Sequence, residues 1–219
     1  GTKKIKDVGY NFGVGILNNN LFFTSEDNIL SDQLWITDGT SNGTKLLKEI
    51  NVLQYFGSIV LNNRLLFFVQ SPTKGIELWE TNGSPNGTLK IKDIPDLQFY
   101  HAPIPLKQIG NTIIFAAHNN LDQLVIYKTD GTKQGTQLLN TSNPLGNVAF
   151  CPYYFNSSVE FNEKLYFSLF SYSNNNCVLF ETDGTDEGTH VSDTSVHFAE
   201  DYTKSKSNFY FYSSGKMYR

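Results

Sequence analysis

The residues of this sequence best placed to do chemistry are carboxylates in a glycine-containing segment. Asp183, Asp186 and Glu187 lie within one short stretch. Their oxygens could bind Ca²⁺, which takes about six to eight oxygen ligands. The same segment recurs elsewhere in the chain without this density of carboxylates. We therefore favour a turn that an Asp side chain stabilises, with a calcium loop as the alternative.

Two carboxylates that face one cleft would indicate glycoside hydrolysis, which needs acids roughly 5 to 10 Å apart. The strands that would line a central cleft are expected at residues 12–17, 56–61, 102–108, 153–159 and 197–203. Only the last contains acids, Glu200 and Asp201, and neighbours on a strand point to opposite faces. The sequence also lacks a nucleophile elbow, a phosphate loop and a zinc-hydrolase helix. We predict that the chain is not an enzyme.

The cysteines and histidines form no metal-binding pattern. Cys151 and Cys177 lack CxxC spacing and fall in one repeat, so a disulfide between them is open. The histidines lie at unlike places in the repeats, at His101, His118, His190 and His197. We predict neither a metal nor a cofactor.

One motif, Thr-Asp-Gly-Thr followed by Gly-Thr, recurs with small variations and determines the fold prediction. Its copies lie at residues 35–44, 79–88, 127–136 and 180–189. The second glycines are Gly43, Gly87, Gly135 and Gly188, and Gly1-Thr2 matches the end of a further copy. The resulting periods run from 42 to 53 residues, and periods of about 40 to 50 are typical of propeller blades.

Each repeat contains four predicted strands. Residues 57–61 and 65–70 are expected to form one hairpin around a turn at 62–64, and residues 76–79 and 88–94 a second hairpin. In the motif, glycine accepts a positive φ, and the preceding Asp or Asn can accept a hydrogen bond from the N–H two residues ahead. The predicted fold is an all-β propeller of four-stranded antiparallel blades.

The two ends of the sequence are expected to complete a fifth blade. Residues 197–203, 208–212 and 216–219 match the first three strands of a repeat, and residues 1–8 match the fourth strand at 87–94. Pairing them would close the ring without exposed edges. The predicted blades are residues 9–50, 51–94, 95–142, 143–194, and 195–219 completed by 1–8. The alternative is an excerpt of a longer array, because the terminal repeats of arrays are usually atypical.

At this point the motif resembles a known family. Glu77-Leu-Trp-Glu-Thr-Asn-Gly-Ser-Pro-Asn-Gly-Thr88 is similar to the ELWxxDGT repeat of large secreted and surface proteins, many of them bacterial. The resemblance covers nearly the whole chain, although Tyr127 and Phe180 replace the motif Trp with other large hydrophobes. It implies an adhesive or scaffolding propeller at the cell surface or secreted. In Bacteroidetes such repeats often occur in proteins exported by type IX secretion.

Two aromatic series recur in the repeats. The first is expected to pack blade against blade. It consists of Trp35, Trp79, Tyr127, Phe180 and Tyr218, with the pairs that end at Phe23, Phe68, Phe115, Phe167 and Phe211. The second precedes the first strand of each repeat and supplies our candidate contacts for a ligand or partner, unless it fills the gap between blades. These candidates are Tyr10, Phe12, Tyr55, Phe56, Phe99, Tyr100, His101, Tyr153, Tyr154, His197 and Phe198.

Charge and hydropathy narrow the partners. With a net charge of −4 and dispersed lysines, the chain has no basic stripe for nucleic acid. No apolar run approaches the roughly 20 residues that span a bilayer, so we expect no membrane insertion. The predicted function is non-catalytic binding, adhesion or scaffolding with a protein partner. A multivalent carbohydrate-binding lectin is the first alternative and a glycosidase-like propeller enzyme the second.

Overall fold

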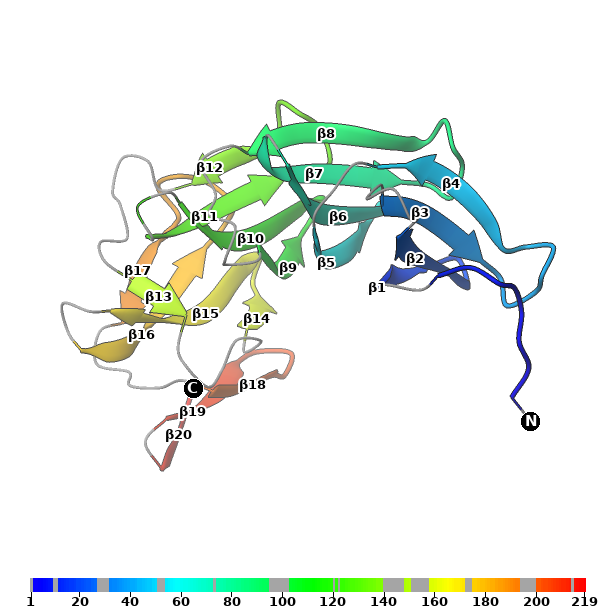
Figure 1. Cartoon of the computed structure of the whole chain (residues 1–219). Coiled ribbons are helices and arrows are strands. Elements are labelled where there is room, and N and C mark those ends of the chain that lie inside the picture. The colour runs from blue at the N-terminus through cyan, green and yellow to red at the C-terminus, as the bar shows by residue number, and fades with distance from the viewer. Residues whose placement is uncertain are drawn as a thin grey trace. The chain divides into compact units, whose positions relative to one another are not determined.

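A computed structural model of the chain contains strands and no helix in the residues that it describes (Figure 1). These residues are 2–9, 12–26, 32–50, 54–72, 74–94, 103–119, 121, 123–139, 148–150, 158–171, 175–193, 200–213 and 215–219. The chain divides into two compact units, one of residues 1–104 with 131–133 and one of residues 105–130 with 134–219. Each unit is described by itself.

The first unit contains two antiparallel sheets of four strands, each built from consecutive strands. The first sheet has the order β1 (Phe12–Leu17), β2 (Asn20–Glu26), β3 (Asp32–Thr37) and β4 (Lys45–Glu49). The second has the order β5 (Gln54–Leu61), β6 (Arg64–Ser71), β7 (Gly75–Thr81) and β8 (Thr88–Ile94). Both sheets agree with the four predicted strands per repeat.

The second unit contains most of the remaining strands in three sheets. One four-stranded sheet runs from β9 (Ile104–Ile109) through β10 (Thr112–His118) and β11 (Leu124–Thr129) to β12 (Gln137–Leu139). In the next, β13 (Val148–Phe150) and β14 (Ser158–Phe161) both pair with β15 (Lys164–Ser171), which continues to β16 (Asn176–Thr182) and β17 (His190–Asp193). The last sheet has three strands, β18 (Glu200–Lys204), β19 (Phe209–Ser213) and β20 (Lys216–Tyr218).

Short asparagine turns join the first two strands of several sheets. Asn18 and Asn19 have φ of 51° and 61°, and Asn62 and Asn63 have φ of 49° and 59°. Two successive residues with positive φ form the turn whose twist matches that of a hairpin, and asparagine tolerates this conformation better than most residues. The predicted turn at residues 62–64 is confirmed, with Arg64 as the first residue of β6.

In the first unit, the core lies between the two sheets. Side chains alternate along each strand, so Phe22 packs toward the second sheet while its neighbour Phe23 stacks on Trp35 on the opposite face. Trp79 packs against this core from the second sheet. The buried cluster consists of Val14, Leu17, Phe22, Leu34, Ile36, Leu47, Ile50, Leu65, Phe67 and Val69.

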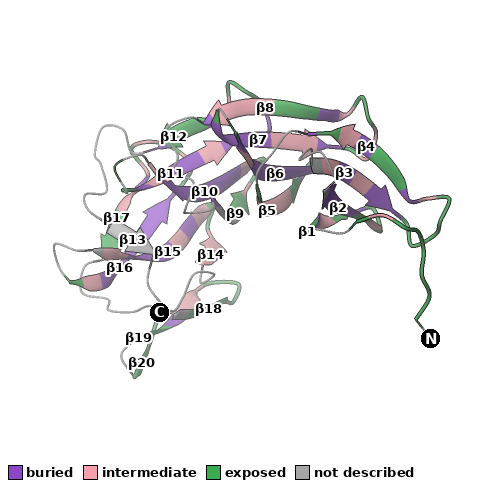
Figure 2. Cartoon of the chain, in the orientation of Figure 1, coloured by how far each residue is buried: buried purple, intermediate pink, exposed green. Residues whose placement is uncertain are grey.

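The second unit repeats this arrangement. One cluster joins β10 and β11 to β15 and β16, and strand β10 is buried over almost its whole length (Figure 2). A smaller cluster places Leu179 against Phe211 of the three-stranded sheet, with Tyr166, Tyr202 and Phe209 packed around them. Burial of apolar surface contributes about 25 cal/mol per Å², so these packed faces are the main stabilising term of each unit.

Candidate binding surface

The two ends of each sheet differ. One end, which we call the turn end, carries the tight turn between the first and second strands and the motif turn between the third and fourth. The other, the loop end, carries the second-to-third connections and the passages from one sheet to the next. Because neighbouring strands are antiparallel, these connections alternate between the two ends. Regular turns and irregular loops are therefore separated.

A closed hydrogen-bond network organises the motif turn. Asp38 Oδ1 accepts hydrogen bonds from the Thr40 N–H at 2.9 Å and the Thr40 hydroxyl at 2.7 Å. The hydroxyl bond comes first among the causes that hold the pKa of Asp38 below its ordinary value. Behind it, the buried Thr37 and Thr44 hydroxyls lie 2.7 Å apart, and the Gly39 N–H donates to Thr37 Oγ1 at 3.0 Å. The predicted Asp-to-backbone bond is confirmed.

The second motif glycine is required for a reason that the sequence alone does not reveal. A Cβ atom on Gly43 would lie 1.9 Å from Asp38 Oδ1, and one on Gly87 would lie 2.0 Å from Asn82 Oδ1. Gly135 and Gly188 have the same relation to Asp130 and Asp183. The constant spacing between the Asp or Asn and this glycine was the available signal.

The copy richest in carboxylates uses its first one in the same way. Asp183 Oδ1 accepts hydrogen bonds from the Thr185 N–H at 2.8 Å and the Thr185 hydroxyl at 2.7 Å. The hydroxyl bond is the main cause that lowers the pKa of Asp183. This carboxylate therefore stabilises the turn, as the turn interpretation requires.

Most of the motif aromatics stack on a partner from the neighbouring strand. The ring centroids are 6.3 Å apart for Phe23 and Trp35, and 5.2 Å apart for Phe115 and Tyr127. In the second sheet, Phe67 and not Phe68 lies opposite Trp79, because β6 begins at Arg64 and its aromatic pair is displaced by one position. The expectation for Phe68 was wrong.

Only three of the eleven candidate contact residues belong to the part of the chain that the structure describes. Phe12 is 47% exposed, whereas Phe56 at the matching position of the next sheet is 7% exposed. Tyr55 is half-buried, and its hydroxyl donates to the Val14 carbonyl at 2.5 Å. Burial raises the pKa of Tyr55 to about 12. The others, Tyr10, Phe99, Tyr100, His101, Tyr153, Tyr154, His197 and Phe198, lie outside the described residues.

The described first strands hold one more acid than expected. Strand β14 extends to Phe161 and so includes Glu160, which forms an ion pair with Lys204 of β18 at 2.6 Å. In β18 the register is irregular between Glu200 and Thr203, and Asp201 has a φ of 51°. Simple alternation therefore does not describe this strand, and the assumption that adjacent acids face opposite sides does not hold there.

Two further buried acids are bound in networks. Glu77 accepts hydrogen bonds from Trp79 Nε1 at 2.8 Å and Lys90 Nζ at 3.2 Å. Burial raises the pKa of Glu181, but hydrogen bonds from Lys164 and Ser192 outweigh it and hold the pKa below its ordinary value. Both carboxylates are fixed in place by neighbours on their own sheet.

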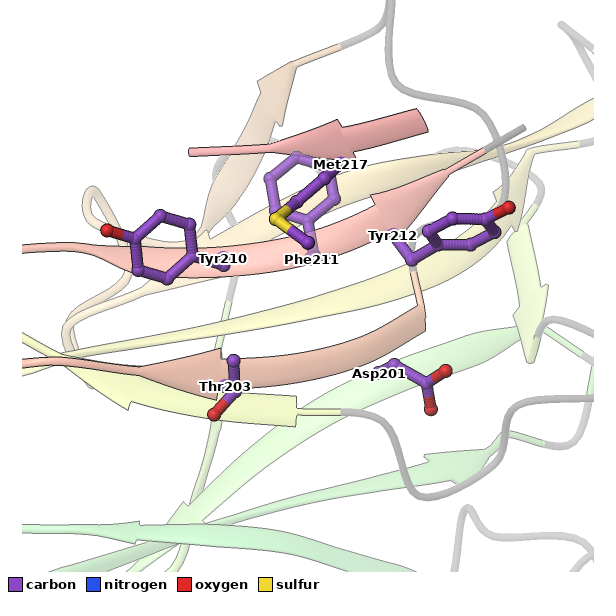
Figure 3. Close-up of a pocket in the computed structure, with 6 residues that line it drawn as sticks. All are labelled: Asp201, Thr203, Tyr210, Phe211, Tyr212 and Met217. Carbon is purple, nitrogen blue, oxygen red and sulfur yellow. The ribbon is translucent and has the colours of Figure 1, made fainter. Parts of the chain in front are cut away.

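An open pocket of about 520 Å³ lies over the three-stranded sheet (Figure 3). Its lining comes from β18, β19 and β20 and was not predicted from the sequence. The lining residues are Asp201, Thr203, Tyr210, Phe211, Tyr212 and Met217.

Sheets of four antiparallel strands that pack face to face define a β-propeller, and the predicted fold class is confirmed. The number of blades stays a prediction. No protein-family model matches the chain, and neither does any curated protein sequence.

Solved structures resemble the chain in fold. An uncharacterized protein of Listeria monocytogenes has a TM-score of 0.58 and 8% identity over 97% of this chain and 61% of its own. A puromycin hydrolase mutant has a TM-score of 0.56 and 11% identity over 94% of this chain and 35% of its own. Prolyl oligopeptidase B from Galerina marginata has a TM-score of 0.51 and 10% identity over 90% of this chain and 29% of its own. At these identities the likeness is one of fold alone.

Proposed function

We propose that this propeller is a non-catalytic binding module that contacts a protein partner within a secreted or cell-surface assembly. The motif turn carries the proposal, because its polar side chains are used within the turn itself. Asp38, Thr37 and Thr44 are hydrogen-bonded to one another's segment. Repetition therefore serves architecture, and binding falls to the loop end, where the repeats differ.

The described acids support a non-catalytic role. Glu160 is paired with Lys204, Glu77 with Lys90 and Glu181 with Lys164. A glycosidase needs one carboxyl group protonated and a second one ionised beside the scissile bond. Carboxylates held by lysines favour the ionised form, and none of these three is matched to the task of a general acid.

A protein partner is favoured over a repeated sugar because matching positions differ between repeats. Phe12 and Phe56 occupy the same place in two neighbouring sheets, yet only Phe12 is exposed. A lectin with several equivalent pockets would present the same side chain in each repeat, since its avidity depends on equal sites. An irregular surface suits one extended protein contact.

A secreted or surface location is supported by the cysteine chemistry. Cys177 is buried and disulfide-bonded, and the only other cysteine in the sequence is Cys151, which lies outside the described residues. Disulfides persist in oxidising compartments and are rare in the cytosol. Within the described ranges, the structure contains no helix of the length and apolarity that a membrane crossing requires.

The test compares the loop end with the turn end. A loop-end variant, Phe12→Ser with Tyr100→Ser, and a turn-end control, Asn42→Ala, would be cross-linked on the surface of the producing cells. We expect one defined protein adduct with the wild type and the control, and its loss in the loop-end variant. Sugar binding on a glycan array that the loop-end variant loses would favour the lectin. Turnover of aryl glycosides would overturn the non-catalytic assignment.

A further inference from the structure

The three-stranded sheet exposes a residue that the other sheets bury. Met217 directly precedes the motif aromatic Tyr218, as Leu34, Ile126 and Leu179 precede theirs. Those three are at most 4% exposed, because the next sheet packs over each of them. Met217 is 77% exposed and forms part of the pocket in Figure 3. This face lacks the cover that its counterparts have.

The same sheet is one strand short. Strands β3, β7, β11 and β16 each pair with a fourth strand, whereas among the described residues β20 pairs only with β19. Unpaired N–H and C=O groups along an edge are a template for another strand. The edge of β20 and the Met217 face are therefore open together.

Residues 2–8 already have the contacts of a fourth strand. Lys6 Nζ donates to the Thr44 carbonyl at 2.6 Å and lies 5.5 Å from the centre of the Trp35 ring. In β4, Lys48 Nζ donates to the Thr88 carbonyl at 2.7 Å and lies 5.8 Å from Trp79. Lys6 follows Gly1 at the same interval at which Lys48 follows Gly43. The N-terminal segment thus contacts the first sheet as β4 contacts the second.

An ion pair within the segment repeats the match. Lys4 and Asp7 lie 3.0 Å apart, and the corresponding Lys90 and Asp93 of β8 lie 2.7 Å apart. Ile5, in contrast, is 40% exposed, whereas the corresponding Leu47 of β4 is buried. The segment resembles a fourth strand whose own sheet does not cover it.

We propose that residues 2–8 add to the free edge of β20 as the fourth strand of that sheet. The register follows β7 and β8, where Glu77 lies opposite Asp93, Leu78 opposite Lys92 and Trp79 opposite Lys90. Transferred to this edge, Asp7 lies opposite Lys216, Lys6 opposite Met217 and Lys4 opposite Tyr218.

Charge and position favour this occupant. Asp7 and Lys216 are opposite charges at facing positions, which stabilises a cross-strand pair. In β8 the register shifts between the partners of Leu78 and Trp79 and leaves Ile91 as the extra residue, so Ile5 takes the same bulged place. A strand on the same chain also has a higher effective concentration than one from a second copy.

A cross-link tests the pairing directly in the full chain. Asp7→Cys with Lys216→Cys places two thiols at the proposed facing positions, and Asp7→Cys with Lys206→Cys is the control, since Lys206 lies in the exposed turn between β18 and β19. After mild oxidation, peptide mapping by mass spectrometry under non-reducing conditions identifies the disulfide. Size-exclusion chromatography with light scattering gives the mass of the linked species.

We expect a disulfide between positions 7 and 216 in the monomer and no disulfide between 7 and 206. Absence of the 7–216 disulfide, or equal formation in the control, overturns the proposal. A 7–216 disulfide found only between two chains overturns it as well, because the strand would then come from a second copy. None of these outcomes depends on the partner or on the proposed function.

Discussion

Asp38 Oδ1 occupies the space beside Gly43, 1.9 Å from where a Cβ atom on that glycine would stand. A methyl group there must displace the carboxylate that holds the Thr40 N–H and hydroxyl. We expect Gly43→Ala to lower the free energy of unfolding by about 1 to 3 kcal/mol, measured by urea denaturation.

The Asp38→Gly background provides the control for that substitution. Without the carboxylate, the methyl group meets an empty space, so Gly43→Ala should lose most of its effect. Gly39→Ala should cost the same in both backgrounds, because its strain arises from a φ of 88° and nothing lies within 4 Å. An equal effect of Gly43→Ala in both backgrounds would contradict the steric explanation.

The buried threonine pair of the fourth motif copy should be similarly sensitive. Thr189 Oγ1 donates to the Thr185 carbonyl at 2.6 Å, so Thr182 supplies the hydrogen between the two hydroxyls, which lie 2.7 Å apart. Thr182 Oγ1 also accepts from the Gly184 N–H at 3.0 Å. Thr182→Val leaves these groups unpaired, and we expect a loss of about 1 to 3 kcal/mol in the free energy of unfolding.

An exposed position in another turn serves as the comparison for Thr182→Val. Ser41→Ala should change the free energy of unfolding by no more than about 0.5 kcal/mol. If Thr182→Val were equally mild, the buried hydroxyl network would contribute little to stability.

Acid should weaken the fold through Glu181. Because the folded-state pKa of Glu181 is lowered, its ionised form contributes stability above its ordinary pKa of 4.5, and this contribution disappears as the pH falls through the folded-state value. Urea denaturation between about pH 7 and pH 3 should show a shallower acid-dependent loss in Glu181→Gln than in the wild type. Glu187→Gln, in the exposed part of the adjacent turn, should leave the slope of the wild type unchanged.

The proposed pairing of Asp7 with Lys216 predicts a charge-reversal pattern. Asp7→Lys and Lys216→Asp each place like charges at facing positions, which should destabilise the fold by about 0.2 to 1 kcal/mol apiece. The double variant should recover part of that loss, while Asp7→Asn, which also loses the Lys4 ion pair, serves as the reference. Simple addition of the two single effects in thermal unfolding would speak against the register.

Local chemistry allowed much of the architecture to be predicted. The motif turn follows from glycine at positive φ and from a carboxylate that bonds two residues ahead, as Asp38 does with Thr40. The hairpin at Asn62 and Asn63 follows from the same kind of rule. Such features depend on residues close in sequence, and the hydrophobic repeat then places the four strands.

The site was less accessible from sequence because it depends on packing between strands. Phe12 and Phe56 look alike in the sequence, but one is exposed and the other buried. Bulges between Gly13 and Gly15 and between Tyr55 and Ser58 break the alternation on which such predictions depend. Likewise, the ion pair of Glu160 with Lys204 joins two strands far apart in sequence, so no local pattern indicates it.

Every described sheet draws its strands from one continuous stretch of the chain. Low contact order of this kind favours rapid folding, because each hairpin closes only a short loop before its contacts form. Pairing of residues 2–8 with β20 would instead join segments separated by almost the entire chain. Assembly of that last sheet should therefore be the slow kinetic step, after the individual sheets have formed.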